Sequence, residues 1–223
     1  MNPNLHGPTP ADVVGALRRG ELDDVVFDRH LPAPLRNLSS NWWTPLAVVH
    51  EVAGWLEEHG IRSILDIGSG AGKFCVATAI LTGIDCHGIE HRARLVRAAR
   101  DLARTFDVEH RAHFVHGALG ERPVPVVDAF YLYNPFGENL FGDALRLDWE
   151  VELGSDRFFR DIEMVRAMLV RAPVGFHAVT YNGFGGRMPD DFEKLRAERR
   201  RTVKLELWRK TRNDVASFEP VSG

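Results

Sequence analysis

The sequence predicts an α/β protein built on a doubly wound, mostly parallel sheet. Strand-like and helix-like segments alternate along most of the 223 residues, which is typical of this class. The segment SILDI at 63–67 is a nearly continuous apolar run, as expected for a strand buried on both faces of a parallel sheet. A glycine-rich stretch follows directly, at the strand end where such sheets bind ligands.

The predicted organisation is an arm, one domain and a tail. We expect residues 1–43 to form an N-terminal helical arm or lid, with one short helix that Thr9 caps and that ends at Gly20. Residues 44–212 form the domain that contains the sheet, and residues 213–223 form a C-terminal tail. With 44% hydrophobic residues, a chain of this length can bury a sizeable core.

The elements of the main domain follow from periodicity and capping signals. Thr44 is expected to cap a helix that has Pro45 at its first position and ends at Gly60. Ser155 is the expected cap of a later helix. The remaining elements alternate, with strands predicted at 63–67, 85–90, 112–117, 127–136, 175–182 and 202–210, and helices at 73–83, 92–106, 156–173 and 190–198.

The stretch ILDIGSGAGK at 64–73 is compatible with three kinds of cofactor site. A phosphate-binding P-loop needs G-x-x-x-x-G-K-[ST], but Ile67 stands where the first glycine belongs, and neither Ser nor Thr follows the lysine. A dinucleotide site needs G-x-G-x-x-G; Gly68 and Gly70 match, while Lys73 occupies the third position. The third pattern, D-x-G-x-G-x-G, matches fully.

The full match comprises Asp66, Gly68, Gly70 and Gly72, with Ser69 between the first two glycines. In this pattern the chain resembles the class I S-adenosylmethionine-dependent methyltransferases, which have a Rossmann-like fold. The resemblance implies that the loop lies under the methionine and ribose portions of the cofactor and that Asp66 orients its amino group. Glycine allows positive φ and lets backbone approach a ligand, and the following helix offers free N–H groups.

Further positions concern the nucleoside half of S-adenosylmethionine. Glu90 ends the second predicted strand, where an acid can accept hydrogen bonds from both ribose hydroxyls and where family members carry one. His91 is then expected near the adenine edge. Ala118 stands where the family often has an aspartate, so either backbone groups near Ala118 or another residue would hold the adenine amino group.

The predicted catalytic residues follow the fourth strand. Asn134, Pro135 and Phe136 resemble the [DNS]-P-P-[YFW] motif of amino-methyltransferases, with one proline fewer. The resemblance implies that Asn134 accepts hydrogen bonds from a target amino group and that Phe136 stacks on the substrate. Proline has no N–H, so it presents only a carbonyl. A plain strand-ending turn is the alternative.

Another resemblance lies upstream, where WWTP at 42–45 matches the aromatic-Thr-Pro element of many amino-methyltransferases. It implies that Thr44 contacts the methionine carboxylate of the cofactor. Trp43 is expected at the mouth of the pocket, and Tyr181, in the strand 175–182, is expected in the substrate site.

Two charged segments are each compatible with two different roles. The loop after Phe136 carries Glu138, Asp143, Asp148, Glu150 and Glu152 against one arginine. It is either a solvated loop or an acidic lid that suits a cationic or amine substrate. The basic run KLRAERRR at 194–201 is expected to be a solvated face, with RNA binding as the alternative.

Composition and charge bear on the partners, the thiols and the location of the protein. The formal net charge of −3 gives no global attraction to nucleic acid or anionic membranes, and we expect neither a membrane segment nor a dedicated DNA-recognition domain. Cys75 and Cys86 are expected to be buried thiols. No metal is expected, and the lack of a signal peptide favours a cytoplasmic location.

The sequence thus favours a methyltransferase that acts on nitrogen, with a small-molecule, protein or RNA acceptor. The alternatives are an S-adenosylmethionine sensor without turnover and a nucleotide-dependent oxidoreductase. Neither the acceptor nor the oligomeric state can be read from the sequence.

Overall fold

The computed structural model describes residues 7–140, 146–200 and 203–213. Its strands are β1 (Ser63–Ile67), β2 (Asp85–Glu90), β3 (Ala112–His116), β4 (Ala129–Leu132), β5 (His177–Tyr181), β6 (Phe192–Arg200) and β7 (Val203–Lys210). Its helices are α1 (Pro10–Arg18), α2 (Asp24–Asp28), α3 (Ala33–Arg36), α4 (Ser39–Trp42), α5 (Leu46–Glu58), α6 (Lys73–Thr82), α7 (Ala93–Thr105) and α8 (Ser155–Arg171), with the 3-10 turn η1 (Gly137–Leu140).

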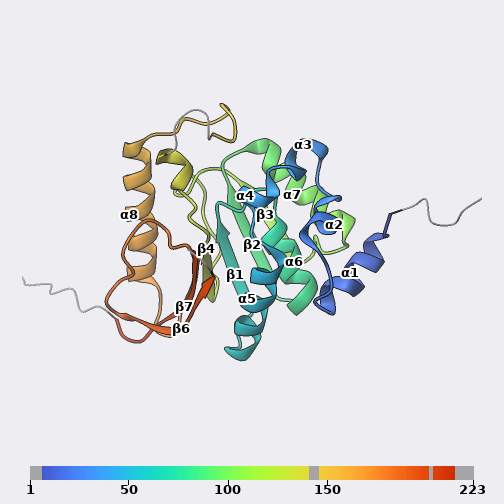
Figure 1. Ribbon diagram of the computed structural model, residues 1–223. Coiled ribbons are helices and arrows are strands. Elements are labelled where there is room, and N and C mark those ends of the chain that lie inside the picture. Colours follow the sequence, from blue (N-terminus) through green and yellow to red (C-terminus); the bar gives the residue numbers. More distant parts are fainter. Residues whose placement is uncertain (1–6, 141–145, 201–202, 214–223) are drawn as a thin grey trace, which may run out of the picture.

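Within these residues the strands form one sheet in the order β3-β2-β1-β4-β5-β7-β6 (Figure 1). β1 to β5 pair in parallel, while β7 runs antiparallel to both β5 and β6. The predicted doubly wound, mostly parallel α/β sheet is therefore confirmed. The order departs from the 3-2-1-4-5-6 order of dinucleotide-binding sheets because β7 is inserted between β5 and β6.

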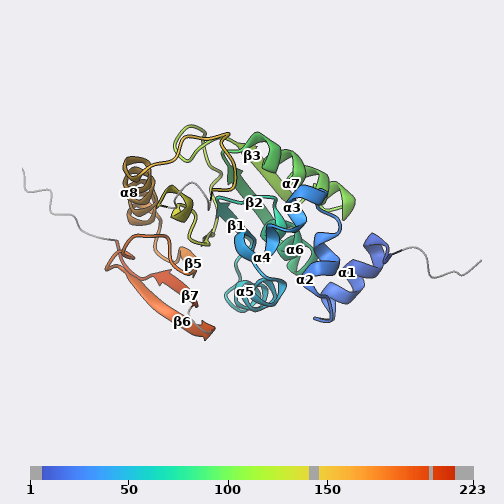
Figure 2. The same cartoon turned by 45° about the horizontal axis from the view of Figure 1, so that its top comes forward.

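Two hydrophobic cores lie on opposite faces of the sheet. Helices α5, α6 and α7 cover one face and α8 covers the other (Figures 1 and 2). In β1, Ile64 belongs to the first core, whereas Leu65 and Ile67 belong to the second. Since side chains alternate across a strand, Asp66 points to the face that α6 covers.

The N-terminal arm packs against α6 rather than standing apart. Its first helix is confirmed, because the Thr9 side chain accepts from the backbone N–H of Asp12 and completes a capping box. The arm continues through α2, α3 and α4, which the sequence reading did not predict. Lys73, at the start of α6, is buried and pairs with Asp24 at 2.5 Å and Asp28 at 2.8 Å. It also donates to the Ser39 hydroxyl.

Two predicted helix starts are shifted. Pro45, not Thr44, occupies the cap position of α5, and Leu46 is the first helical residue. Thr44 lies one residue too early to cap, and its hydroxyl is bonded elsewhere. Ser155 is the first residue of α8 and follows a Gly154 cap, so its predicted capping role is wrong.

The predicted helix 190–198 is also wrong, because Phe192–Arg200 forms β6 in a hairpin with β7. The segment is rich in good helix formers such as Leu, Glu, Lys and Arg, but β7 offers it a ladder of hydrogen bonds that an isolated short helix could not match. The ladder carries an irregularity between Lys194 and Arg196.

The remaining expectations concern the two cysteines, the C-terminal tail, membrane segments and metal ions. Cys75 and Cys86 are buried and free, as predicted. Of the predicted tail, residues 214–223 lie outside the described residues. No helix in the described ranges has both the length and the apolar character needed to span a bilayer. Over the same ranges, no group of three or more His, Cys, Asp or Glu is placed to hold a metal ion.

Candidate functional site

The glycine loop between β1 and α6 adopts a conformation that depends on its glycines. Gly68, Gly70 and Gly72 have φ values of +79°, +54° and +79°, a region that other residues rarely adopt. A Cβ at Gly68 would lie 3.2 Å from the Cβ of Pro135. A Cβ at Gly72 would lie 2.7 Å from the Phe114 ring. The loop is therefore packed closely on both sides.

Two residues of the loop have packing roles. Gly72 lines neither of the hollows described below, because it is pressed against α7 and β3. The Ser69 hydroxyl turns toward β2, where a Cβ on Gly88 would lie 2.6 Å from its oxygen. The Ser69 N–H donates to the Ile89 carbonyl at 3.1 Å, and the Ser69 carbonyl accepts from Gly72 at 2.9 Å. Ser69 therefore fixes the loop, and Gly88 leaves room for its side chain.

Glu90, the last residue of β2, is fixed to this loop. Its carboxylate accepts hydrogen bonds from the backbone N–H groups of Gly70 at 3.1 Å and Arg92 at 2.8 Å. Burial raises the pKa of Glu90, and the two backbone bonds partly offset this effect. Because each carboxylate oxygen has further lone pairs, Glu90 can still accept hydrogen bonds from a ligand.

Asp66, near the end of β1, is a buried carboxyl group without a cationic partner among the described residues. The Cys75 thiol donates to it, with Sγ 3.8 Å from Oδ2. Burial raises the pKa of Asp66 to about 8, because a carboxylate loses its hydration there. A cation that entered the hollow beside Asp66 would favour the ionised form.

That hollow has a volume of about 30 Å³ and lies under the glycine loop. Thr44 and Tyr131 line it, and their hydroxyl oxygens are 2.9 Å apart. Trp43 lines it too, and its buried Nε1 has no hydrogen-bond partner among the described residues. Because buried N–H groups are nearly always bonded, this one is a candidate donor to a ligand.

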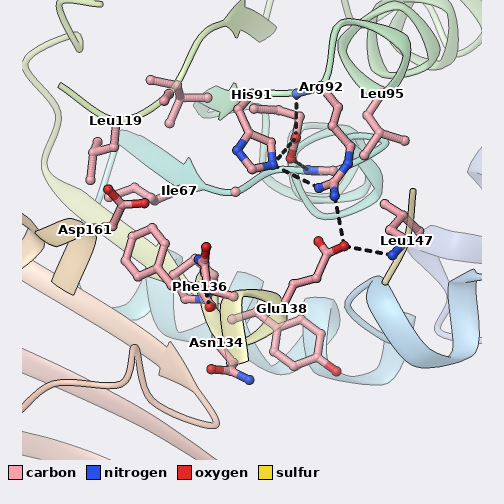
Figure 3. A pocket seen from close by; sticks show the side chains of 18 of the residues that line it. Ile67, His91, Arg92, Leu95, Leu119, Asn134, Phe136, Glu138, Leu147 and Asp161 are labelled. Atoms are coloured by element: carbon pink, nitrogen blue, oxygen red, sulfur yellow. Dashed lines mark hydrogen bonds and ion pairs between the residues drawn. The ribbon is translucent and has the colours of Figure 1, made fainter. Parts of the chain in front are cut away.

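A larger cleft of about 120 Å³ adjoins the hollow, and the two share Trp42, Trp43, Gly68, Gly70 and Tyr133 as lining residues. The cleft follows the carboxyl ends of β1, β2, β3 and β4, which is where open α/β sheets bind ligands. Many of the predicted site residues line it: Trp43, Gly68, Gly70, Glu90, His91, Ala118, Asn134, Pro135 and Phe136. Figure 3 labels His91, Asn134 and Phe136 among them.

The segment after β4 enters the cleft through a strained residue. Asn134 has a φ of +38°, which is uncommon for a residue other than glycine and is often found at functional sites. Its N–H donates to the carbonyl of Gly183 at 3.0 Å, and its carbonyl accepts from Gly137 at 3.1 Å. These bonds hold the segment Asn134–Phe136 in place at the cleft.

Tyr181 lines neither the cleft nor the hollow. It stands behind Tyr133, with ring centroids 4.5 Å apart, and Tyr133 lines both cavities. Tyr181 thus supports a cleft residue from the neighbouring strand.

The acidic loop is held by arginines at the start of α7. Arg92 is buried and pairs with Glu138 at 2.9 Å and Asp148 at 2.8 Å. Arg94 pairs with Asp148 as well and with Glu150 at 3.1 Å. These acids are therefore compensated within the chain, which removes the argument for an acidic lid that attracts a cation. Asp143 lies outside the described residues.

His91 is enclosed by two arginines. Its Nε2 is 2.9 Å from Nη1 of Arg92, and its Nδ1 is 3.2 Å from Nη2 of Arg157. Burial, followed by the charges of Arg92 and Arg157, lowers the pKa of His91 to about 3. The imidazole is therefore neutral at physiological pH.

The sequence reading assigned no role to three charged residues that line the cleft: Arg92, Arg157 and Asp161. A fourth, Glu138, was expected only as part of the acidic loop. Arg92 bonds to side chains 46 and 56 residues downstream, so no local pattern marks it. Asp161 lies in an amphipathic helix where an acid is ordinary. The available signal was an arginine two positions after the strand-ending Glu90.

The fold, with its cleft at the carboxyl ends of the strands, is shared with known proteins. No family model and no curated protein matches this sequence. Comparison with solved structures finds methyltransferases, and the chain has their Rossmann-like fold.

Three of these structures illustrate the likeness. An RNA methyltransferase from Salinibacter ruber, solved with S-adenosyl-L-homocysteine, has a TM-score of 0.57 at 20% identity over 78% of this chain and 97% of its own. A putative methyltransferase from Escherichia coli has a TM-score of 0.53 at 13% identity over 74% and 85%. A putative methylase from Haemophilus influenzae has a TM-score of 0.52 at 14% identity over 74% and 89%.

Proposed function

We propose that the protein is an S-adenosylmethionine-dependent methyltransferase that acts on nitrogen. The observation that carries the proposal is the pair of buried acids, Asp66 and Glu90, at the ends of adjacent strands on either side of a positive-φ glycine loop. The shared fold supports it, since one of the solved structures was determined with S-adenosyl-L-homocysteine.

The residues present suit the chemical groups of this cofactor. Asp66 has no cationic partner among the described residues, so it suits the α-ammonium group. The unpaired Nε1 of Trp43 and the Thr44 hydroxyl suit the α-carboxylate. Glu90 keeps free lone pairs for the ribose hydroxyls. Gly68 and Gly70 line both cavities and have no Cβ, so the loop can approach a ligand closely between these groups.

When bound, S-adenosylmethionine supplies an electrophilic methyl group on a sulfonium centre. The protein has to align an acceptor with that methyl group and to exclude water. We assign the alignment to Asn134, whose side-chain oxygen accepts a hydrogen bond from the acceptor N–H. Pro135 adds a carbonyl, and Phe136 adds an apolar wall. This choice of nitrogen depends on the resemblance of Asn134–Phe136 to the amino-methyltransferase motif.

The mouth of the cleft favours a planar acceptor. Trp42, Trp43 and Tyr133 line both the hollow and the cleft, and aromatic side chains stack well on flat groups. The basic run 194–201 gives little support for RNA, because Lys194 pairs with Glu206 and Arg196 pairs with Glu58. We therefore keep a small molecule, a protein side chain or an exposed RNA base as acceptors.

Calorimetry with S-adenosylhomocysteine and with NAD(H) tests the cofactor. We expect micromolar or tighter binding of the former, lost on Glu90→Gln and kept in Glu109→Gln, which changes an exposed glutamate. Tight NAD(H) binding with no response to S-adenosylhomocysteine would establish the oxidoreductase alternative instead.

A labelled methyl donor screened over amines, phenols, RNA and protein extract tests turnover. With an acceptor identified, Asn134→Ala should lower kcat by about 10²-fold or more and leave S-adenosylhomocysteine affinity within about threefold. Asn37→Ala, at an exposed position, is the matched control. Binding without turnover of any acceptor would favour the sensor, and full activity of Asn134→Ala would contradict its catalytic role.

A further inference from the structure

Asp161 is a buried carboxylate that lines the cleft and has no part in the proposed methyl transfer. It lines the same cleft as Ala118, which stands where the methyltransferase resemblance leads one to expect an aspartate. We propose that Asp161, on α8, accepts a hydrogen bond from the exocyclic amino group of the adenine and so selects an adenosyl cofactor. This inference rests on the proposed function, because it presupposes that an adenosyl ligand enters the cleft.

Contacts on both sides of Asp161 fix its place. Residues 157, 161 and 164 share one face of α8, since they are spaced by four and three positions. Arg157 reaches His91, just after β2, at 3.2 Å. Met164 packs on the loop after β3, where a Cβ on Gly120 would lie 2.6 Å from its sulfur. Asp161 therefore lies between the loops after β2 and β3.

The close view agrees with this placement. Figure 3 shows Asp161 on the same side of the pocket as Leu119, beside Phe136, while Arg92 and Leu95 stand on the opposite side. Ala118 and Leu119 line the same cleft. The carboxylate of α8 and the short side chain of Ala118 therefore face the same cleft.

Asp161 has an oxygen available for a ligand. Its Oδ2 accepts a hydrogen bond from Nε of Arg157 at 3.3 Å. Its Oδ1 is 3.6 Å from Nε of Arg160, which is an ion-pair distance but too long for a hydrogen bond. An ionised carboxylate only accepts hydrogen bonds, so it suits the amino group of adenine and opposes the carbonyl oxygen of hypoxanthine.

Comparing two ligands that differ only in this group tests the proposal. Calorimetry would measure the affinity of S-adenosylhomocysteine and of its deaminated analogue S-inosylhomocysteine for the full-length protein. We expect the wild type to prefer the adenosyl ligand by about tenfold or more, as a charge-assisted hydrogen bond predicts. Asp161→Asn should abolish or reverse the preference, because its amide can donate to the carbonyl.

Arg157→Gln is the matched control for a purely structural role. It removes the partner of Oδ2 and leaves the carboxylate, so the preference for the adenosyl ligand should persist. If Asp161 acted only as the ion-pair partner of Arg157, both variants would weaken the two ligands equally. That result would overturn the inference, as would equal binding of both ligands by the wild type. Should the wild type bind neither ligand, the proposed function itself would fail.

Discussion

Two clusters of charged side chains adjoin the glycine loop, and they differ in how their charges are compensated. The arm anchor consists of Lys73, Asp24, Asp28 and Ser39, and its lysine contacts both acids and the hydroxyl. The cofactor acids, Asp66 and Glu90, have a thiol and two backbone N–H groups as hydrogen-bond partners. One cluster is complete in itself, whereas in the other Asp66 has no cationic partner among the described residues.

The difference separates a structural cluster from a binding site. A buried ion pair whose members satisfy one another has no capacity left for a ligand. Burial raises the pKa of both Asp66 and Glu90, and raised carboxyl pKa values in a cleft are a mark of function. We infer that the missing positive charge at Asp66 comes from the ligand.

The largest effect is expected from breaking the complete cluster. Lys73→Met would leave the buried Asp28 carboxylate unpaired, which should lower the free energy of unfolding by about 3–5 kcal/mol. Urea denaturation measures this change. The triple variant Lys73→Met, Asp24→Asn, Asp28→Asn removes the stranded charges as well and should recover much of the loss. A loss below about 1 kcal/mol for the single variant would show that the anchor contributes little.

At Asp66 a substitution is expected to stabilise the protein rather than to destabilise it. Because the pKa of Asp66 rises from 3.8 to about 8 on folding, its contribution to stability is fully present below pH 3.8 and is lost as the pH rises toward 8. Asp66→Asn does not titrate. Its free energy of unfolding relative to wild type should therefore increase by about 2–4 kcal/mol between pH 5 and pH 9.

The same variant should lose about tenfold or more in S-adenosylhomocysteine affinity, so that stability and binding change in opposite directions. Urea denaturation at the two pH values and calorimetry measure the two effects. Glu109→Gln, at an exposed position, is the control and should show neither. If Asp66→Asn were less stable than wild type at pH 9, the ionised Asp66 carboxylate would not destabilise the ligand-free protein, which would contradict the prediction.

Proton release on ligand binding tests whether the ligand supplies the positive charge that Asp66 lacks. Below pH 8 the Asp66 carboxyl is protonated, and an arriving ammonium group favours its ionisation, so binding should release up to one proton. The dissociation constant should then fall by up to about tenfold per unit as the pH rises toward 8. Calorimetry in buffers of different ionisation enthalpy, at pH 7 and pH 9, counts the protons. Proton uptake at pH 7, or equal release by Asp66→Asn, would refute this assignment.

Local sequence patterns predicted the residues that line the cleft better than they predicted the contacts around it. The strand that carries Asp66 near its end, the glycine spacing and the strand that ends in Glu90 are local patterns, and β1 and β2 lie side by side in the sheet. Long-range contacts could not be read in this way. The ion pairs of Lys73 have no local signal, because its acids lie about 45–50 positions upstream in the arm. The strand β6 was read as a helix because its partner β7, rather than its own composition, decides its structure.

The smallest expected effect concerns the thiol that partly stabilises the Asp66 carboxylate. The Cys75 thiol donates to Asp66 and lowers its pKa against the larger effect of burial. Cys75→Ala removes this donor, so the pKa of Asp66 should rise by about half a unit. The midpoint of proton release on S-adenosylhomocysteine binding should then move to higher pH, while affinity at pH 9 stays within about twofold.

Cys86→Ala is the matched control, since Cys86 is an equally buried thiol on the adjacent strand β2 and has no recorded hydrogen bond to Asp66. Both variants remove one buried sulfur, so both should lose a similar amount of stability, and the midpoint should move only for Cys75→Ala. A shift to lower pH would mean that the thiol repels the carboxylate rather than bonding to it. If the midpoint shifted equally in the two variants, the cause would be the lost packing rather than the thiol hydrogen bond. In that case only the ligand would stabilise the ionised form of Asp66.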